Sequence, residues 1–179
     1  PGSRKQEVSR MLTVMLDVVK EFPNYQFVVA CAPSLPMSYY KKIIGDKSGV
    51  RLVCNRTYQL LQLSSAAIVT SGTATLETAL FDVPEVVCYK ANKLSYLIAK
   101  KLAKVKYISL VNLIMDRMVV KELIQNDMTV DNIVDEIKSL LTNQKRQRKL
   151  LEDYEELKYV LGNTGASDRA AETIISYVK

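Results

Sequence analysis

Short apolar runs alternate with segments of helical periodicity along this sequence, and this alternation constrains the fold more than any other feature. We expect strands at residues 26–31, 51–54, 66–70, 85–89 and 107–109, and helices at residues 5–20, 36–44, 58–63, 73–80 and 94–103. The apolar runs are rich in valine and apolar on both faces, which is typical of buried parallel strands. The sequence therefore predicts an α/β fold, in which helices cover both faces of a parallel sheet.

From Thr129 onward the sequence is helical and polar, with interruptions at Asn143 and at residues 162–165. We interpret residues 1–179 as a single domain in which residues 129–179 form a helical C-terminal extension. A chain of this length, with 48% hydrophobic residues, buries roughly 70% of its unfolded surface, which is enough for a core. No apolar run approaches the ~18 residues of a transmembrane helix.

The segment SGTATLE, at residues 71–77, follows an expected strand and opens an expected helix. Such a junction lies at the carboxyl end of a strand, where backbone N–H groups and the positive end of the helix dipole attract phosphate oxygens. Gly72 lacks the Cβ that would block a close approach, and hydroxyl groups stand at Ser71, Thr73 and Thr75. The motif predicts a phosphate site, and an ordinary capped helix start is the alternative.

Glu77 does not have the spacing of a capping carboxylate. A capping box needs Ser or Thr three residues before the Glu, and Ala74 occupies that position here. A carboxylate just beyond a phosphate-binding turn can accept hydrogen bonds from both hydroxyls of a ribose, as in dinucleotide-binding folds. We therefore add Glu77 to the candidate nucleotide site.

A second Gly-Ser turn, PGSR, precedes the first expected helix and adds Gly2, Ser3 and Arg4 to the candidate site. Arginine is unfavourable beside the positive end of a helix dipole unless an anion lies near. Arg4 therefore suits a diphosphate partner. A solvated arginine at a frayed terminus is the alternative interpretation.

Four motifs, in this order along the chain, resemble lipid A disaccharide synthase: PGSRKQE, SGTATLE, YISLVNLIMDRMVVKELIQ and GASDRAAE. The resemblance implies an inverting glycosyltransferase of the GT-B type, with two Rossmann-like domains. This chain is similar to the C-terminal, nucleotide-sugar-binding domain, and the N-terminal acceptor domain is absent from it. The sequence departs from the family at Val111, where proline is usual, and at Asp116, in a loop that often contains glycine.

The resemblance also implies the reaction and the partners. The family transfers 2,3-diacylglucosamine from its UDP conjugate to 2,3-diacylglucosamine 1-phosphate (lipid X), which yields lipid A disaccharide 1-phosphate and UDP. It places Asn112, Glu122 and Gln125 in the donor-site region, although a turn cap is the alternative for Asn112 and a surface helix position for Glu122. Helix N-termini and Arg4 would stabilise the charge on departing UDP. The chain has no histidine, so we expect the acceptor domain to supply the catalytic base.

Neither a metal nor another cofactor is expected. The three cysteines, Cys31, Cys54 and Cys88, lie in separate apolar runs without CxxC spacing, and there is no histidine to complete a zinc site. Such cysteines are typical of buried thiols in a reducing compartment. With the family resemblance, we expect a cytoplasmic enzyme that is peripheral at the inner membrane.

Residues 93–106, KLSYLIAKKLAKVK, combine apolar positions at helical spacing with lysines around the other side. Lysines on such a surface attract an anionic membrane by about 1 kcal/mol each, and a solvated face of an amphipathic helix is the alternative. The net charge of +6 fits a membrane surface or an anionic substrate. Nucleic acid is not expected, because the sequence has no tryptophan, no RNA-binding aromatic signature and no recognition-helix pattern.

Two other functions remain open from sequence. UDP-N-acetylglucosamine 2-epimerases share the two-domain architecture and a Ser-Gly turn followed by glutamate, and a non-catalytic UDP-binding module is the third possibility. Self-association is also expected. In the family the final helix, here residues 168–179, packs its apolar side on the first domain, and a strand expected directly before Pro1 would leave a gap or an unpaired sheet edge.

Overall fold

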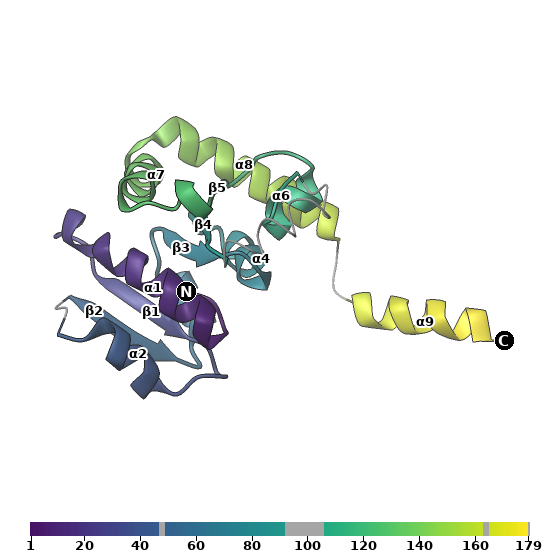
Figure 1. Cartoon of the computed structure of the whole chain (residues 1–179). Coiled ribbons are helices and arrows are strands. Elements are labelled where there is room, and N and C mark those ends of the chain that lie inside the picture. The colour runs from purple at the N-terminus through teal and green to yellow at the C-terminus, as the bar shows by residue number, and fades with distance from the viewer. Residues whose placement is uncertain (47–48, 92–105, 163–164, 179) are drawn as a thin grey trace.

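The computed structural model describes residues 1–46, 49–91, 106–162 and 165–178 (Figure 1). In chain order its α-helices, strands and short 3-10 helices (η) are α1 (Lys5–Asp17), η1 (Val19–Glu21), β1 (Phe27–Cys31), α2 (Met37–Ile44), β2 (Val50–Cys54), α3 (Thr57–Gln62), β3 (Ala67–Thr70), α4 (Thr73–Leu80), β4 (Glu85–Tyr89), α6 (Leu110–Met115), β5 (Lys121–Ile124), η2 (Gln125–Asp127), α7 (Val130–Thr142), α8 (Gln144–Leu161) and α9 (Ala166–Val178).

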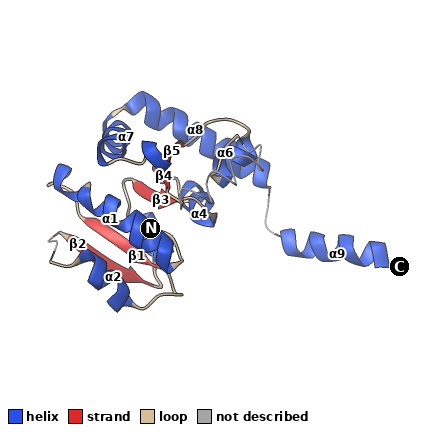
Figure 2. Ribbon diagram, viewed as in Figure 1, coloured by secondary structure: helices blue, strands red, loops and turns tan. Residues whose placement is uncertain are grey.

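All of the strand pairs are parallel, and helices flank them (Figure 2). One sheet pairs β1 with β2, and the other has the order β3-β4-β5. In the second sheet Ala67 lies opposite Glu85 and Val87 lies opposite Glu122. The α/β prediction is confirmed, and the first four expected strands lie within one residue of their expected bounds.

The two sheets leave one edge of β1 and one edge of β3 without a strand partner among the described residues. The chain start lies between the carboxyl ends of these strands. The amine of Pro1 has the thiol of Cys31, at the end of β1, among its electrostatic neighbours. Gly2 approaches Thr70, at the end of β3. This is the position at which we expect the strand that would precede Pro1, and that strand remains a prediction.

Helix α1 connects the cores of the two sheets because it buries two adjacent stripes. Val8, Leu12 and Leu16 pack into a smaller core with residues of β1 and α2. Met11 and Met15 pack into a larger core with residues of β4, β5, α7 and α8. The apolar spacing of α1 therefore holds together two sheets that share no hydrogen-bonded strand.

Two sequence-based expectations differ from the structure. The strand expected at residues 107–109 is wrong: the segment is an irregular turn. The N–H of Ile108 donates to the Glu122 carboxylate, and its carbonyl accepts from the Ser71 hydroxyl, so neither group enters a strand ladder. Strand β5 was not expected, because apolar and polar residues alternate only weakly in residues 119–124, VVKELI. The helix expected at residues 94–103 lies outside the described residues, as does most of the basic segment 93–106.

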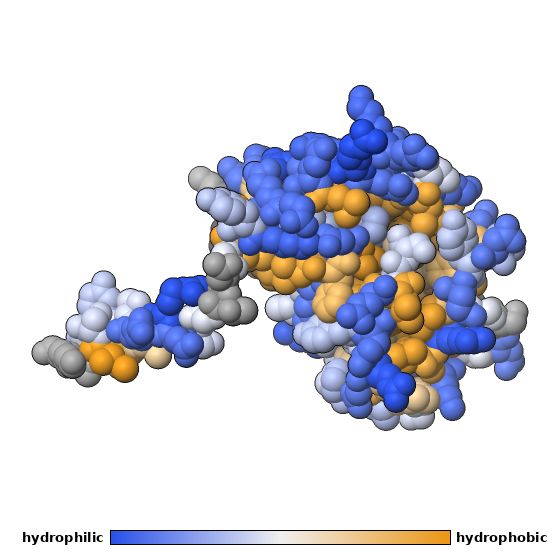
Figure 3. Space-filling view, turned by 180° about the vertical axis from the view of Figure 1, so that it is seen from behind, coloured by the Kyte–Doolittle hydropathy of each residue, from blue (hydrophilic) through white to orange (hydrophobic). Residues whose placement is uncertain are grey.

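The C-terminal helix α9 stands apart from the body (Figures 1 and 3). Its Ile174 and Ile175 side chains are 64% and 57% exposed. In the space-filling view apolar residues cross the middle of the body, whereas the apolar side of α9 contacts nothing there. No helix within the described part of the chain combines the length and the apolarity that a bilayer crossing requires.

Candidate functional site

The structure brings the two predicted turns together at the carboxyl ends of the strands. Gly2 has a φ of +98°, and a Cβ on it would lie 3.0 Å from Cβ of Glu7 and 3.6 Å from Cγ2 of Thr70. Only glycine accommodates both the conformation and the contact. Residues 1–4 therefore lie against the end of β3, directly beside the turn that opens α4.

The turn at residues 71–75 presents backbone donors. The N–H of Gly72 has no acceptor among the described residues, and those of Thr73 and Ala74 belong to the first turn of α4, where no intrahelical acceptor exists. Gly72 has a φ of +155°, and a Cβ there would meet no atom within 4 Å. The backbone at the start of α4 is thus open, and the phosphate site there remains a prediction.

The three hydroxyl groups of this turn differ in availability. Ser71 Oγ donates to the carbonyl of Ile108 at 2.7 Å. Thr75 is buried, and its Oγ1 donates to the carbonyl of Gly72 at 2.8 Å. Thr73 is exposed and makes no side-chain hydrogen bond within the described part of the chain. Of these three hydroxyls, only that of Thr73 keeps its proton free for a ligand.

Arg4 has an anion beside it within the chain. Its Nη1 lies 3.1 Å from Oε1 of Glu7, and its backbone N–H donates to the other oxygen of that carboxylate at 3.3 Å. Glu7 therefore offsets the unfavourable position of the arginine at the start of α1. The Arg4 side chain is still 83% exposed, so the outer face of its guanidinium remains accessible.

Glu77 lies on α4, one turn beyond the backbone donors of residues 72–74. Its side chain is half-buried, and it forms no hydrogen bond or ion pair with any residue that the structure describes. This differs from Glu7, which is a capping carboxylate. Glu77 can therefore accept hydrogen bonds from outside the chain.

Asn112 is fully buried on α6, and its amide is saturated within the protein. Oδ1 accepts from the N–H groups of Val119 and Val120, at 2.8 and 3.0 Å. Nδ2 donates to the carbonyl of Val120 and to Glu122, both at 2.8 Å. An amide has two acceptor and two donor positions, so Asn112 has none left for a ligand. These hydrogen bonds hold the loop at residues 116–120 against α6. Asp116, the first residue of this loop, adopts the left-handed conformation with a φ of +46°.

Glu122 and Gln125 differ in whether their side-chain polar groups are already hydrogen-bonded. The Glu122 carboxylate accepts from four donors: the N–H groups of Ile108 and Ser109, the Ser109 hydroxyl and the Asn112 amide. Gln125, directly after β5, has a φ of +54° and a buried Nε2 that has no hydrogen-bond partner within the described part of the chain. Of the three residues that the resemblance places here, only Gln125 has an unused side-chain donor.

Sequence reasoning missed the turn at residues 107–109 as part of the site region. Ser109 caps α6, since its Oγ accepts from the N–H of Asn112 at 3.2 Å. A serine three residues before Asn112 is an N-cap pattern, and this signal was present in the sequence. The link from Ile108 to Ser71 spans 37 residues and had no local signal.

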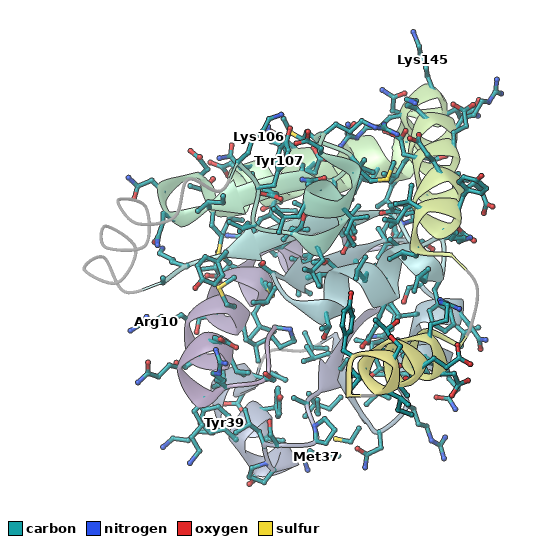
Figure 4. All side chains as sticks on the ribbon, turned by 90° about the vertical axis from the view of Figure 1, so that its right-hand side faces the viewer. Arg10, Met37, Tyr39, Lys106, Tyr107 and Lys145 are labelled. Atoms are coloured by element: carbon teal, nitrogen blue, oxygen red, sulfur yellow. The ribbon has the colours of Figure 1, made fainter. Side chains whose placement is uncertain are left out.

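A hollow of about 420 Å³ is lined by residues of α1 and by the two residues that directly follow β4. It is lined by Ser9, Arg10, Thr13, Val14, Lys90 and Ala91. Figure 4 shows Arg10 projecting outward from α1, and neither Arg10 nor Lys90 forms an ion pair with a described residue. The basic charge of the protein is therefore not confined to Arg4.

Among the described residues, no group of three or more His, Cys, Asp or Glu side chains has an arrangement that could hold a metal ion. The thiols of Cys31 and Cys88 are buried, and burial raises the pKa of each to about 12. Both thiols therefore stay protonated at neutral pH, which makes them poor nucleophiles.

Comparison with known proteins gives one consistent family. A family model described as lipid-A-disaccharide synthetase matches residues 1–176. The lipid-A-disaccharide synthase of Syntrophus aciditrophicus (strain SB) is 40% identical across the whole chain, which covers 48% of that protein. That of Myxococcus xanthus (strain DK1622) is 36% identical over 98% of the chain and 47% of its own length. The chain thus spans about half the length of the curated relatives that it matches.

Proposed function

This chain belongs to the lipid-A-disaccharide synthase family, and from this premise we propose that it is the nucleotide-sugar-binding domain of a glycosyltransferase in lipid A biosynthesis. Residues 1–179 form one domain of GT-B type, with residues 129–179 as its helical extension. The relatives are about twice as long, which leaves room for an N-terminal acceptor domain in the whole protein.

The observation that carries this proposal is the juxtaposition of the two turns. The diphosphate of UDP lies against the backbone N–H groups of residues 72–74, which point outward at the start of α4. The exposed guanidinium of Arg4, with Gly2 and Ser3 behind it, lies on the other side of the diphosphate. Glu77 accepts hydrogen bonds from the ribose hydroxyls, which accounts for a half-buried carboxylate that has no partner among the described residues.

The reaction that this site serves is transfer of 2,3-diacylglucosamine from UDP to the hydroxyl of a 2,3-diacylglucosamine 1-phosphate acceptor, with inversion at the anomeric carbon. The C–O bond to UDP breaks, and negative charge develops on the departing diphosphate. Fixed N–H dipoles and Arg4 stabilise that charge. The acceptor hydroxyl loses its proton to a base, which we assign to the N-terminal domain.

Both substrates carry acyl chains, so the enzyme works at a membrane surface. We place it on the cytoplasmic side of the inner membrane as a peripheral protein. We assign the attraction to anionic lipid to the lysines in the sequence of residues 93–106, together with Arg10 and Lys90. Each lysine near such a surface contributes about 1 kcal/mol.

Self-association is a further part of the proposal. Ile174 and Ile175 on α9 are 64% and 57% exposed, and each large apolar side chain gains about 1.5–3 kcal/mol on burial. Light scattering of the isolated chain should therefore show a dimer or a larger species. A clean monomer with strong amide protection across α9 would contradict this.

The central experiment compares the isolated chain with the full-length protein. Calorimetric titration of the chain with UDP, UMP and ADP should show weak binding with preference for UDP, and the chain alone should form no disaccharide. The full-length protein should form disaccharide from the UDP-sugar and the acceptor, and should not epimerise UDP-N-acetylglucosamine. Equal affinity for the three nucleotides, or none for any, would refute the donor site. Epimer formation would favour the isomerase instead.

A further inference from the structure

Glu122 is the best-connected carboxylate near the site, although it faces the chain and not the open turn. Its Oε1 lies 2.7 Å from Oγ of Ser109 and 2.9 Å from the Ser109 nitrogen, and its Oε2 lies 3.0 Å from the Ile108 nitrogen. Ser109 is fully buried. The carboxylate on β5 therefore fixes the backbone at residues 108–109 in one conformation.

The fixed backbone in turn holds the anion-binding turn. The carbonyl of Ile108, on the residue whose N–H donates to Glu122, accepts the Ser71 hydroxyl at 2.7 Å. Ser71 begins the turn, and its N–H donates to the carbonyl of Cys88 at the end of β4. Ser71 is thus tied to the sheet through its backbone and to residues 107–109 through its side chain.

We infer that Glu122 is a positioning residue for the donor site: through Ile108 it fixes Ser71, and so sets the direction of the backbone N–H groups of residues 72–74. This rests on the proposed function, since those N–H groups are the ones that we assign to the diphosphate. A turn whose first residue is already held through both its backbone and its side chain loses less conformational freedom when the ligand binds, which favours affinity. Asn112 on α6, and Ser109 as the N-cap of that helix, support the same arrangement.

The test is a double-mutant cycle of UDP affinity on the chain, with Glu122→Ala and Ser71→Ala. Each single change should weaken UDP binding by about tenfold, the equivalent of one net hydrogen bond. If Glu122 acts through Ser71, Glu122→Ala should add no more than about twofold in the Ser71→Ala background. Multiplication of the two losses would show that Glu122 acts independently of Ser71, and would overturn the inference.

Two further measurements keep the result interpretable. Glu122→Gln retains an acceptor oxygen, so it should recover part of the affinity and provides a folded variant if Glu122→Ala unfolds. Without any ligand, amide NMR resonances of residues 71–75 should shift in either variant together with those of Ile108 and Ser109. Shifts confined to residues 108–109 would refute the link to Ser71. Because this readout needs no UDP, failure of the chain to bind UDP would refute the proposed function without deciding this inference.

Discussion

Glu122 and Glu85 lie on neighbouring strands of one sheet, yet their surroundings are opposite. Glu122 on β5 accepts hydrogen bonds from four donors. Glu85 opens β4, is fully buried, and neither of its carboxylate oxygens has a hydrogen-bond partner among the residues that the structure describes. Desolvation therefore raises the pKa of Glu85 well above its ordinary value. The comparison teaches that donors, and not burial alone, decide whether a carboxylate stabilises the structure.

The strongest test of this comparison removes the satisfied carboxylate. Glu122→Ala should lower the free energy of unfolding by about 3–4 kcal/mol, because several donors that are shielded from water lose their acceptor and each such loss costs about 1–3 kcal/mol. Urea denaturation at pH 7 measures the change. Glu155→Ala, at a carboxylate that is 71% exposed, is the matched control and should change stability by less than about 0.5 kcal/mol. Equal losses of stability in Glu122→Ala and Glu155→Ala would show that the hydrogen bonds of Glu122 do not stabilise the structure.

Glu77 extends the comparison to a carboxylate that has no hydrogen-bond donor in the described part of the chain but is accessible to a ligand. Glu77→Gln should weaken UDP binding by about 1–3 kcal/mol, the range for hydrogen bonds to a charged group. The thermal midpoint without ligand should stay unchanged, because no internal bond is lost. Calorimetry provides the affinity, and Glu172→Gln on α9 is the control. A loss of stability without a loss of affinity would mean that Glu77, like Glu122, accepts hydrogen bonds within the chain.

Glu85→Gln should raise the free energy of unfolding, whereas Glu122→Gln should lower it. The change removes a buried acid that has no partner, so we expect the free energy of unfolding at pH 7 to rise by about 1–2 kcal/mol. Urea denaturation of both variants under the same conditions is the measurement. Destabilisation by both changes would show that Glu85 has donors in solution.

The raised pKa of Glu85 also determines how the stability gain of Glu85→Gln depends on pH. Folded Glu85 keeps its proton at pH values where the unfolded chain, with a pKa near 4.3, has lost it, so its contribution to stability falls as pH rises. The difference between Glu85→Gln and the unmodified chain should thus be small below about pH 4 and grow toward neutral pH. A difference that is independent of pH would contradict the buried-acid interpretation.

The smallest effect is expected at Arg4, where exposure weakens the charge. Arg4→Ala should reduce UDP affinity by about 1 kcal/mol and leave uridine affinity unchanged, because only UDP carries the diphosphate. Arg10→Ala, on the helix that Arg4 precedes, is the matched control and should leave the ratio of UDP to uridine affinity unchanged. An unchanged ratio in Arg4→Ala would mean that the arginine serves only Glu7.

The predicted elements and the predicted site residues differed in how far the sequence could determine them. Helices and buried strands followed from apolar spacing, which acts within a few residues, so the bounds of α4 and β4 agree with the sequence-based ones. The strand prediction for residues 107–109 was wrong because the apolar pattern of this segment resembles a strand, whereas its backbone groups form hydrogen bonds with the side chains of Glu122 and Ser71. The resemblance identified the region of Asn112 and Glu122 but not the direction of their hydrogen bonds.

The sequence by itself determined the class of fold, the position of both turns and the family, because periodicity, glycines and ordered motifs are local properties. Only the tertiary structure decided which polar groups remain open. Thr73 and Glu77 have no partner in the described chain, whereas Ser71, Asn112 and Glu122 are bound to backbone groups elsewhere in the protein. The reason is physical: a hydrogen bond between residues 37 positions apart depends on how β3, β5 and α6 pack, and no local pattern encodes that contact.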